Sequence, residues 1–278
     1  MHQVLMQSKS ALNGKAVGLW AINQFFLFLF CKANHLAYLC IVMPNTFFRF
    51  KQFVVYQGQC AMKVGTDSVL LGAWARGGSR MLDIGCGTGV IAMIMAQRFP
   101  LSQIDAVDID PSACKQAVVN VGMSPFDRQV HVVCSSIQQW ADSPHLQGCY
   151  DALVSNPPFF DNALKAPDSL RNTARHTDTL PFDQLFMSAK RLLDQEGEFS
   201  VIIPFDYKAK LQREASLCGF TLAREYAVKT TPHKAPKRYL LAFRLHPVKD
   251  FDRQEVVLEM APGVRSEWYH KITDDFYL

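Results

Sequence analysis

The segment Asn-Pro-Pro-Phe at residues 156–159 combines residue types that could hold an amino group for chemistry. The side-chain oxygen of Asn156 and the carbonyl oxygen of Pro157 are neighbouring acceptors, and proline fixes its backbone angle. Accepting both N–H groups of an amine whose lone pair is delocalised aims that lone pair, while Phe159 offers a face for stacking. Asn156, Pro157, Pro158 and Phe159 are therefore candidate catalytic residues. The alternative is a Pro-Pro turn capped by core phenylalanines.

A glycine-rich turn, LDIGCGTGV at 82–90, suggests what such an amine would meet. Its spacing D-x-G-x-G-x-G differs from the dinucleotide motif, because Asp83 would oppose a pyrophosphate and welcome a cationic ligand. Asp108 follows about 20 residues later, where a carboxylate accepts hydrogen bonds from ribose hydroxyls. Asp110, directly before Pro111, better fits a charge at a helix N-terminus. The pattern predicts an adenosine ligand with a positive charge and no phosphates, and S-adenosylmethionine is the common cofactor of that kind.

Strands and helices alternate around these residues. We expect strands at 80–84, 103–109, 129–135, 150–156, 197–204 and 239–245, with helices at 66–75, 89–99, 111–122, 181–193 and 207–219. The aromatic segment 47–57 predicts a further strand, and 228–239 a basic connector. This alternation favours an α/β fold with a parallel, doubly wound sheet and helices on both faces. Ligands of such sheets lie beyond the carboxyl ends of the strands.

The composition fits an ordinary globular protein. Of 278 residues, 49% are hydrophobic and 19% charged, and the net charge of +4 permits a polyanionic partner without requiring one. None of the eight cysteines forms a C-x-x-C pair, and no Cys/His cluster resembles a zinc site, so we expect no metal. We expect reduced thiols in a cytoplasmic protein.

Residues 1–42 form an apolar extension that does not match the rest of the chain. Three interpretations stay open: translation beginning at Met43, which we favour; a membrane anchor; and a helical appendage. Asn23 and Gln24 interrupt the apolar run early, so it falls short of the roughly 20 apolar residues of a membrane span. We expect no stable membrane association.

The motifs resemble those of class I S-adenosylmethionine-dependent methyltransferases with an N-P-P-[YF] motif. Over roughly residues 46–278, the chain resembles the bacterial tRNA1(Val) adenine-37 N6-methyltransferases. The segments that carry this resemblance are FKQFVVYQGQCAMKVGTDSVLLGAWA (50–75), LDIGCGTGVIAMIMAQR (82–98), SIQQW (136–140), SNPPFF (155–160) and ARHTDTLPFDQL (174–185).

The resemblance implies a Rossmann-like fold with a mostly parallel, seven-stranded sheet. It also implies one methyltransferase domain at 43–278, with a strand/helix appendage at 43–78, and a valine-accepting tRNA as substrate. Residues implied at the cofactor are Lys63, Gly65, Thr66, Asp67, Asp83, Gly85, Cys86, Gly87, Thr88, Gly89, Asp108, Ile109, Ser136, Ile137 and Asn156. Residues implied in RNA binding are Arg171, Arg175, His176, Lys234, Lys237 and Arg238.

Two residues depart from the family pattern. Ser136 stands where an aspartate usually contacts the cofactor's adenine, so this contact is weaker, and Phe159 replaces the more familiar tyrosine. The same motif chemistry also serves guanine N2 in ribosomal RNA and a glutamine amide of a protein release factor. The basic connector 229–238 favours RNA over protein, and the lack of a second, degenerate half argues against the duplicated rRNA enzymes. A third hypothesis, a non-catalytic RNA-binding protein that keeps the fold, conflicts with the intact motifs.

Overall fold

A computed structural model describes residues 46–58, 60, 63–158 and 180–278. Contacts divide the chain into two units, Met1–Thr46 and Phe47–Leu278, and the second contains the sheet and the predicted site. The predicted extension 1–42, the candidate stacking residue Phe159 and the predicted RNA contacts Arg171, Arg175 and His176 lie outside the described residues. No helix in the described ranges is long and apolar enough to cross a bilayer.

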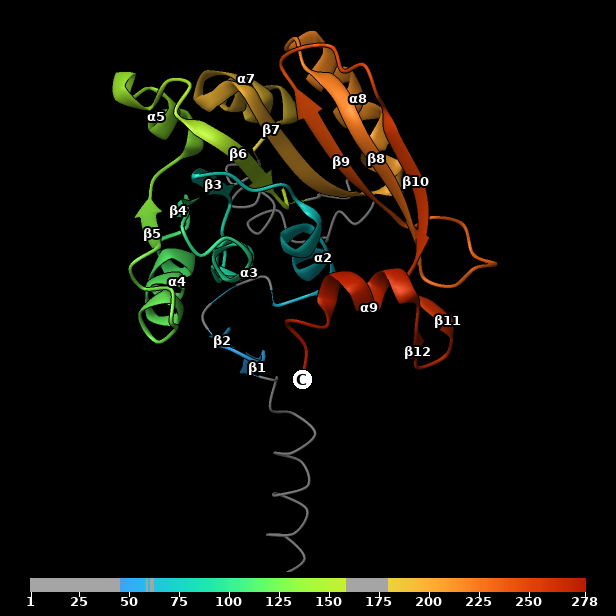
Figure 1. The fold of residues 1–278 in the computed structure, drawn as a ribbon. Helices are drawn as coiled ribbons and strands as arrows, with labels where there is room; N and C mark the ends of the chain where they lie inside the picture. The colour runs from blue at the N-terminus through green and yellow to red at the C-terminus, as the bar shows by residue number, and fades with distance from the viewer. Residues whose placement is uncertain (1–45, 59, 61–62, 159–179) are drawn as a thin grey trace, which may run out of the picture. The chain divides into compact units, whose positions relative to one another are not determined.

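An eight-stranded sheet forms the centre of the second unit, in the order β10-β8-β9-β7-β6-β3-β4-β5 (Figure 1). Its strands are β3 (Arg80–Ile84), β4 (Gln103–Asp108), β5 (Val130–Cys134), β6 (Tyr150–Ser155), β7 (Leu193–Pro204), β8 (Thr221–Lys229), β9 (Arg238–Arg244) and β10 (Asp252–Val257). Strands β5, β4, β3, β6 and β7 pair in parallel, and β9 is antiparallel to both of its neighbours. The predicted class is confirmed, and β10 adds an eighth strand, parallel to β8, at the edge.

Successive side chains of a strand point to opposite faces of the sheet, and here both faces are apolar. Helices therefore cover both faces. Met81 and Ala152 face one core cluster, which includes residues of α2 (Thr66–Trp74), α3 (Val90–Arg98) and α4 (Pro111–Gly122). Leu82 and Leu153 face a second cluster, with α5 (Ile137–Ala141), α7 (Phe182–Leu192) and α8 (Lys208–Leu217). One-residue steps along β3 and β6 thus switch side chains between the two cores.

Shorter elements complete the described chain. They are the hairpin strands β1 (Phe47–Arg49) and β2 (Val54–Tyr56), the 3-10 turns η1 (Pro144–Leu146) and η2 (Phe205–Tyr207), the strands β11 (Glu259–Ala261) and β12 (Val264–Arg265), and the helix α9 (Glu267–Thr273). The single strand predicted at 47–57 is wrong: the backbone turns between β1 and β2, and the two strands pair antiparallel. Phe50 and Phe53 stack at this turn, with ring centroids 4.7 Å apart.

The sheet topology brings the sequence motifs to one edge. Strand β3 lies between β4 and β6 and is parallel to both, so the carboxyl ends of the three strands meet there. The glycine turn follows β3, Asp108 ends β4, and Asn156 follows β6. Strand β6, the fourth strand counted from the glycine turn, thus lies beside β3, the first.

Candidate active site

The glycine turn after β3 leaves open space above its backbone. Gly85 and Gly87 have φ angles of 74° and 55°, a region that side-chain-bearing residues rarely adopt. A Cβ placed on either glycine would meet no atom within 4 Å. The amides of Gly85 and Cys86 donate to Val107 O at 2.8 and 3.1 Å, which fixes the turn against β4. A ligand can therefore approach this backbone closely.

Asp108 links the glycine turn to the end of β4. Its carboxylate accepts the amide of Gly87 at 2.8 Å and that of Asp110 at 2.9 Å, and the residue is only partly buried. Asp110 caps α4 instead, accepting the amide of Ser112 at 2.8 Å. The prediction that Asp110 lies at the start of the helix is confirmed. That Asp108 contacts the ligand stays a prediction.

Asp83 is fully buried beneath the turn. Its Oδ2 accepts the amide of Ala92 at 3.2 Å, while its Oδ1 has no hydrogen-bond partner among the described residues. Burial raises the pKa of Asp83 to about 7, and the charge of Asp108 adds to the rise, although the Ala92 amide opposes it. An acceptor oxygen with no donor and a carboxyl that ionises near neutral pH both suit a neighbouring cation.

Ser136 already uses its hydroxyl in the fold. It is the N-cap of α5 and accepts the amide of Gln139 at 3.2 Å, while the next residue, Ile137, is buried. A hydroxyl has a second lone pair and a proton to offer. The expected contact between Ser136 and the cofactor's adenine stays a prediction.

Asn156 has one satisfied and one unsatisfied end. Its Nδ2 donates to Ser68 Oγ of α2 at 3.5 Å, and its Oδ1 is buried without a hydrogen-bond partner among the described residues. Beside it, Ser155 Oγ donates to Ile84 O of β3 at 2.9 Å, and Pro157 is buried. An acceptor held in place without a donor is what an incoming N–H group needs.

A cavity of about 370 Å³ adjoins Asn156. It contains several predicted residues that are distant in sequence: its lining is Lys63, Gly65, Thr66, Asp67, Ser68, Leu70, Asn156, Val228, Thr230, Lys237, Arg238 and Leu258. Arg238 of β9 forms an ion pair with Asp67 of α2. Lys234 lies in the exposed β8–β9 loop and is not part of this lining.

Two residues at the site were not predicted from the sequence. Ser68 orients the amide of Asn156, and its position directly after Asp67 was the only available signal. Asn120 of α4 is fully buried: its Nδ2 donates to Tyr56 O at 2.8 Å and to Thr88 O at 2.9 Å, and its Oδ1 accepts the Tyr56 amide at 2.9 Å. Asn120 connects β2 to the glycine turn. The only signal for this role in the sequence is an asparagine among the apolar residues of a predicted helix.

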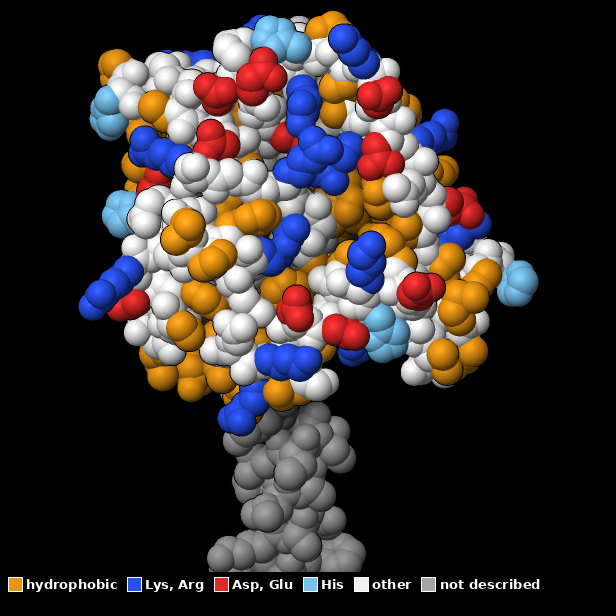
Figure 2. All heavy atoms as spheres, in the orientation of Figure 1, with side chains coloured by type: hydrophobic (Ala, Val, Ile, Leu, Met, Phe, Trp, Pro, Cys, Tyr) orange, Lys and Arg blue, Asp and Glu red, His pale blue; other side chains and the backbone are white. Residues whose placement is uncertain are grey.

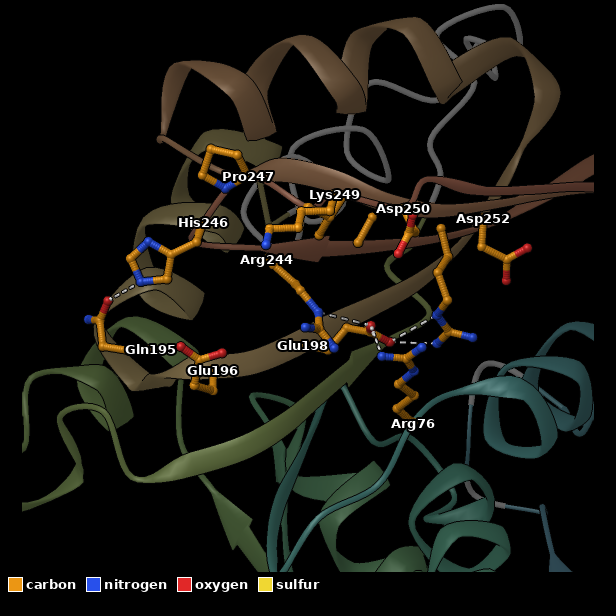
Figure 3. Close-up of a pocket in the computed structure, with 13 residues that line it drawn as sticks. Arg76, Gln195, Glu196, Glu198, Arg244, His246, Pro247, Lys249, Asp250 and Asp252 are labelled. Atoms are coloured by element: carbon orange, nitrogen blue, oxygen red, sulfur yellow. Dashed lines mark hydrogen bonds and ion pairs between the residues drawn. The ribbon is translucent and has the colours of Figure 1, made fainter.

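A second cavity, of about 350 Å³, lies at the opposite end of the strands, where β7, β8 and β10 begin. Figure 3 shows Arg76 and Arg244 pointing toward Glu198, whose side chain is 3% exposed. Glu198 also accepts Arg224 Nη2 at 2.5 Å and Arg224 Nε at 3.2 Å. Acidic side chains, Asp250 among them, also line this cavity, and Figure 2 shows acidic and basic groups interspersed over this face. This cluster holds the sheet edge together and contains no residue predicted to do chemistry.

Comparisons with known proteins agree with the geometry. The model of the methyltransferase small domain matches residues 62–224. A relative from Phocaeicola vulgatus is 46% identical over 238 residues, covering 85% of this chain and 99% of that protein, and one from Serratia proteamaculans is 40% identical over 234 residues, covering 83% and 89%. Both are named tRNA1(Val) (adenine(37)-N6)-methyltransferase. This chain belongs to that methyltransferase family. It is accordingly an enzyme, and S-adenosylmethionine is its methyl donor.

The fold is also that of solved methyltransferases. A predicted O-methyltransferase from Agrobacterium tumefaciens superposes with a TM-score of 0.57, covering 76% of this chain and 96% of its own. The sequence identity is 14%, so this likeness concerns the fold alone.

The described residues fit S-adenosylmethionine. The turn at Gly85 and Gly87 is open to a ligand, and the carboxylate of Asp108 reaches the same space through its bond to Gly87. The unpaired Oδ1 of Asp83 suits the positive charge of the donor. Ile109, 59% exposed although apolar, offers a surface that a flat purine can cover.

The six cysteines in the described ranges are free thiols, and Cys134 is exposed.

Proposed function

We propose that this methyltransferase modifies the exocyclic N6 of adenine 37 in tRNA1(Val). The observation that carries the proposal is the buried Oδ1 of Asn156, an acceptor with no donor among the described residues, at the edge where the glycine turn also lies. The names of relatives that share 40–46% of their residues with this chain support the choice of acceptor. The domain that acts is the single methyltransferase domain predicted at 43–278, and its place of action is the cytoplasm, where tRNA is modified.

Orientation of the acceptor amine is the main task of the chain. The Oδ1 of Asn156 and the carbonyl of Pro157 accept the two N–H groups of the adenine amine, so its lone pair is turned away from them and toward the methyl donor. The rigid proline keeps the two acceptors at a fixed separation. Fixed polar contacts of this kind contribute about 10²–10³ in rate each. Phe159 and Pro158 complete the acceptor side in this proposal.

S-adenosylmethionine, when bound, supplies an electrophilic methyl group. The residues we propose to hold it are Asp83, Gly85, Cys86, Gly87, Thr88, Gly89, Asp108, Ile109, Ser136 and Ile137, with Lys63, Gly65, Thr66 and Asp67 at its border. Asp108 binds the ribose hydroxyls with its remaining lone pairs. Asp83 balances the positive charge from below.

The RNA approaches across the cavity beside Asn156. Lys237 is exposed there and has no ion pair among the described residues, so it is available to a phosphate, whereas Arg238 is already paired with Asp67. We also propose that Lys234, Arg171, Arg175 and His176 contribute to this RNA-binding side.

One experiment separates the possible acceptors. The protein is incubated with labelled S-adenosylmethionine and bulk RNA from a strain that lacks the gene, and the RNA is digested to nucleosides. We expect N6-methyladenosine among the nucleosides of the tRNA fraction. N2-methylguanosine, or label found only in protein, would point to the other acceptors of the same chemistry. RNA binding without transfer would leave a non-catalytic role.

A further inference from the structure

Phe205 presents an exposed aromatic ring at the same sheet edge as Asn156. It directly follows β7, which pairs in parallel with β6, and Ser155 lies opposite Val201. Because β7 continues to Pro204, its end lies about 10 Å farther along the strand direction than that register point. Phe205 as a residue is 54% exposed, more than any other phenylalanine of the described ranges. It therefore lies at the rim of the acceptor site, not inside it.

The backbone and one neighbour hold this ring in place. The Phe205 amide donates to Lys237 O at 3.0 Å, and the ring lies 6.1 Å from that of Tyr239, tilted by 35°. Tyr239 is buried and is itself covered by Lys208, whose Nζ lies 4.1 Å from the ring centroid and 2.7 Å from Glu225 Oε1. Phe205 thus combines a hydrogen-bonded backbone, one aromatic neighbour and an exposed side chain.

The backbone hydrogen bond of Phe205 leads to a lysine that lines the cavity of Asn156. Lys237, bonded to Phe205 through its backbone, lines the cavity of Asn156 together with Arg238. An aromatic face next to unpaired positive charge is the combination that binds single-stranded nucleic acid, because every base has a face to stack and every nucleotide a phosphate. Bases in a duplex are stacked on each other and not available to such a ring.

We propose that Phe205 stacks on an unpaired base next to the adenine that is methylated, while Lys237 contacts the phosphate between them. This inference rests on the proposed function, since it requires an RNA acceptor. Phe205 would then bind the neighbouring nucleotide, while Asn156 accepts a hydrogen bond from the target amine.

The test compares Phe205→Ala with Phe205→Trp and with the control Phe251→Ala. Phe251 is also an exposed phenylalanine, 46% accessible, but lies in the β9–β10 connection, away from this edge. We expect Phe205→Ala to raise the KM for tRNA about 10- to 100-fold while kcat and the Kd for S-adenosylmethionine keep their wild-type values. Phe205→Trp and Phe251→Ala should keep a KM near that of wild type.

Fluorescence gives a readout independent of turnover. An unpaired oligoribonucleotide of about eight nucleotides should quench the emission that Phe205→Trp adds to wild type, and a blunt RNA duplex should not. If wild type forms N6-methyladenosine in tRNA but Phe205→Ala keeps the wild-type KM, or Phe205→Trp shows no quenching, the stacking role is wrong and the proposed function stands. If wild type transfers methyl groups only to protein, both proposals fail together.

Discussion

Ser68 and Asn156 meet across 88 residues of sequence, with Asn156 Nδ2 donating to Ser68 Oγ at 3.5 Å. The bond engages the nitrogen end of the amide. With Nδ2 engaged by α2, Oδ1 is left as a buried acceptor without a partner in the described part of the chain. The orientation of the proposed catalytic amide therefore depends on the first turn of α2.

Replacing Ser68 tests that dependence. In Ser68→Ala the amide of Asn156 can rotate and present Nδ2 to the acceptor amine, so we expect kcat to fall about tenfold. The KM for tRNA and the affinity for S-adenosylmethionine should change little, because Ser68 acts through Asn156. Ser68→Thr keeps a hydroxyl and should recover most of kcat. A Ser68→Ala enzyme with wild-type kcat would show that α2 does not set the amide.

The titration of Asp83 predicts a pH dependence of stability. Its pKa rises from 3.8 to about 7 on folding, chiefly through burial. Below pH 3.8 Asp83 is protonated in both the folded and the unfolded state. Between pH 3.8 and about 7 the unfolded chain releases this proton and the folded chain retains it. The free energy of unfolding therefore falls by about 1.4 kcal/mol for each pH unit in this range. Stability from this group is therefore lost as the pH rises through that window.

Asp83→Asn removes this titration. In cofactor-free protein, we expect the free energy of unfolding of the variant, relative to wild type, to increase as the pH rises from 4 to about 7 and then level off. Urea unfolding at a series of pH values measures it, and the difference between the two proteins cancels the other carboxyl groups. Parallel stability curves for the two proteins would mean that Asp83 titrates normally.

Glu198 should matter for stability and not for chemistry. Its buried carboxylate is shared by Arg76, Arg224 and Arg244, so Glu198→Gln leaves these guanidinium groups facing one another. We expect a loss of about 3–5 kcal/mol in the free energy of unfolding, with kcat unchanged in the protein that remains folded. Glu196→Gln, an exposed neighbour in the same strand, is the matched control and should change stability little. Equal unfolding midpoints for the two variants would contradict this account.

The same cluster explains why one strand could not be predicted. The segment Thr221–Lys229 contains Arg224 and Glu225, and charges in mid-segment do not suggest a central strand. Both side chains are nevertheless buried, because Arg224 pairs with Glu198 of β7 and Glu225 with Lys208 of α8. Partners that neutralise a charge lie on other elements, so a local pattern cannot reveal them. Strands β3, β4 and β6 were predicted because their apolar residues lie in short runs next to a glycine turn, a Pro-started helix or the Asn-Pro-Pro motif, although they too contain charges.

The site divides in the same way. Asp83, Asp108 and the Asn156 motif were found because each sits at a fixed spacing from a glycine turn or a strand end. The ion pair of Arg238 with Asp67 depends instead on β9 and α2 meeting in the folded chain, and no spacing predicts it. Phe205 likewise reads as an ordinary core residue until the fold shows it at the edge of the sheet.

Asn156→Ala, assayed for cofactor binding and for turnover side by side, tests the central claim most directly. The variant loses an acceptor for the target amine and leaves the glycine turn, Asp83 and Asp108 untouched. We predict that calorimetry gives a Kd for S-adenosylmethionine within about threefold of wild type, while kcat on tRNA falls by about 10²–10³. A variant with the wild-type kcat, or one whose turnover fails only because the cofactor no longer binds, would contradict the role of this amide in holding the acceptor.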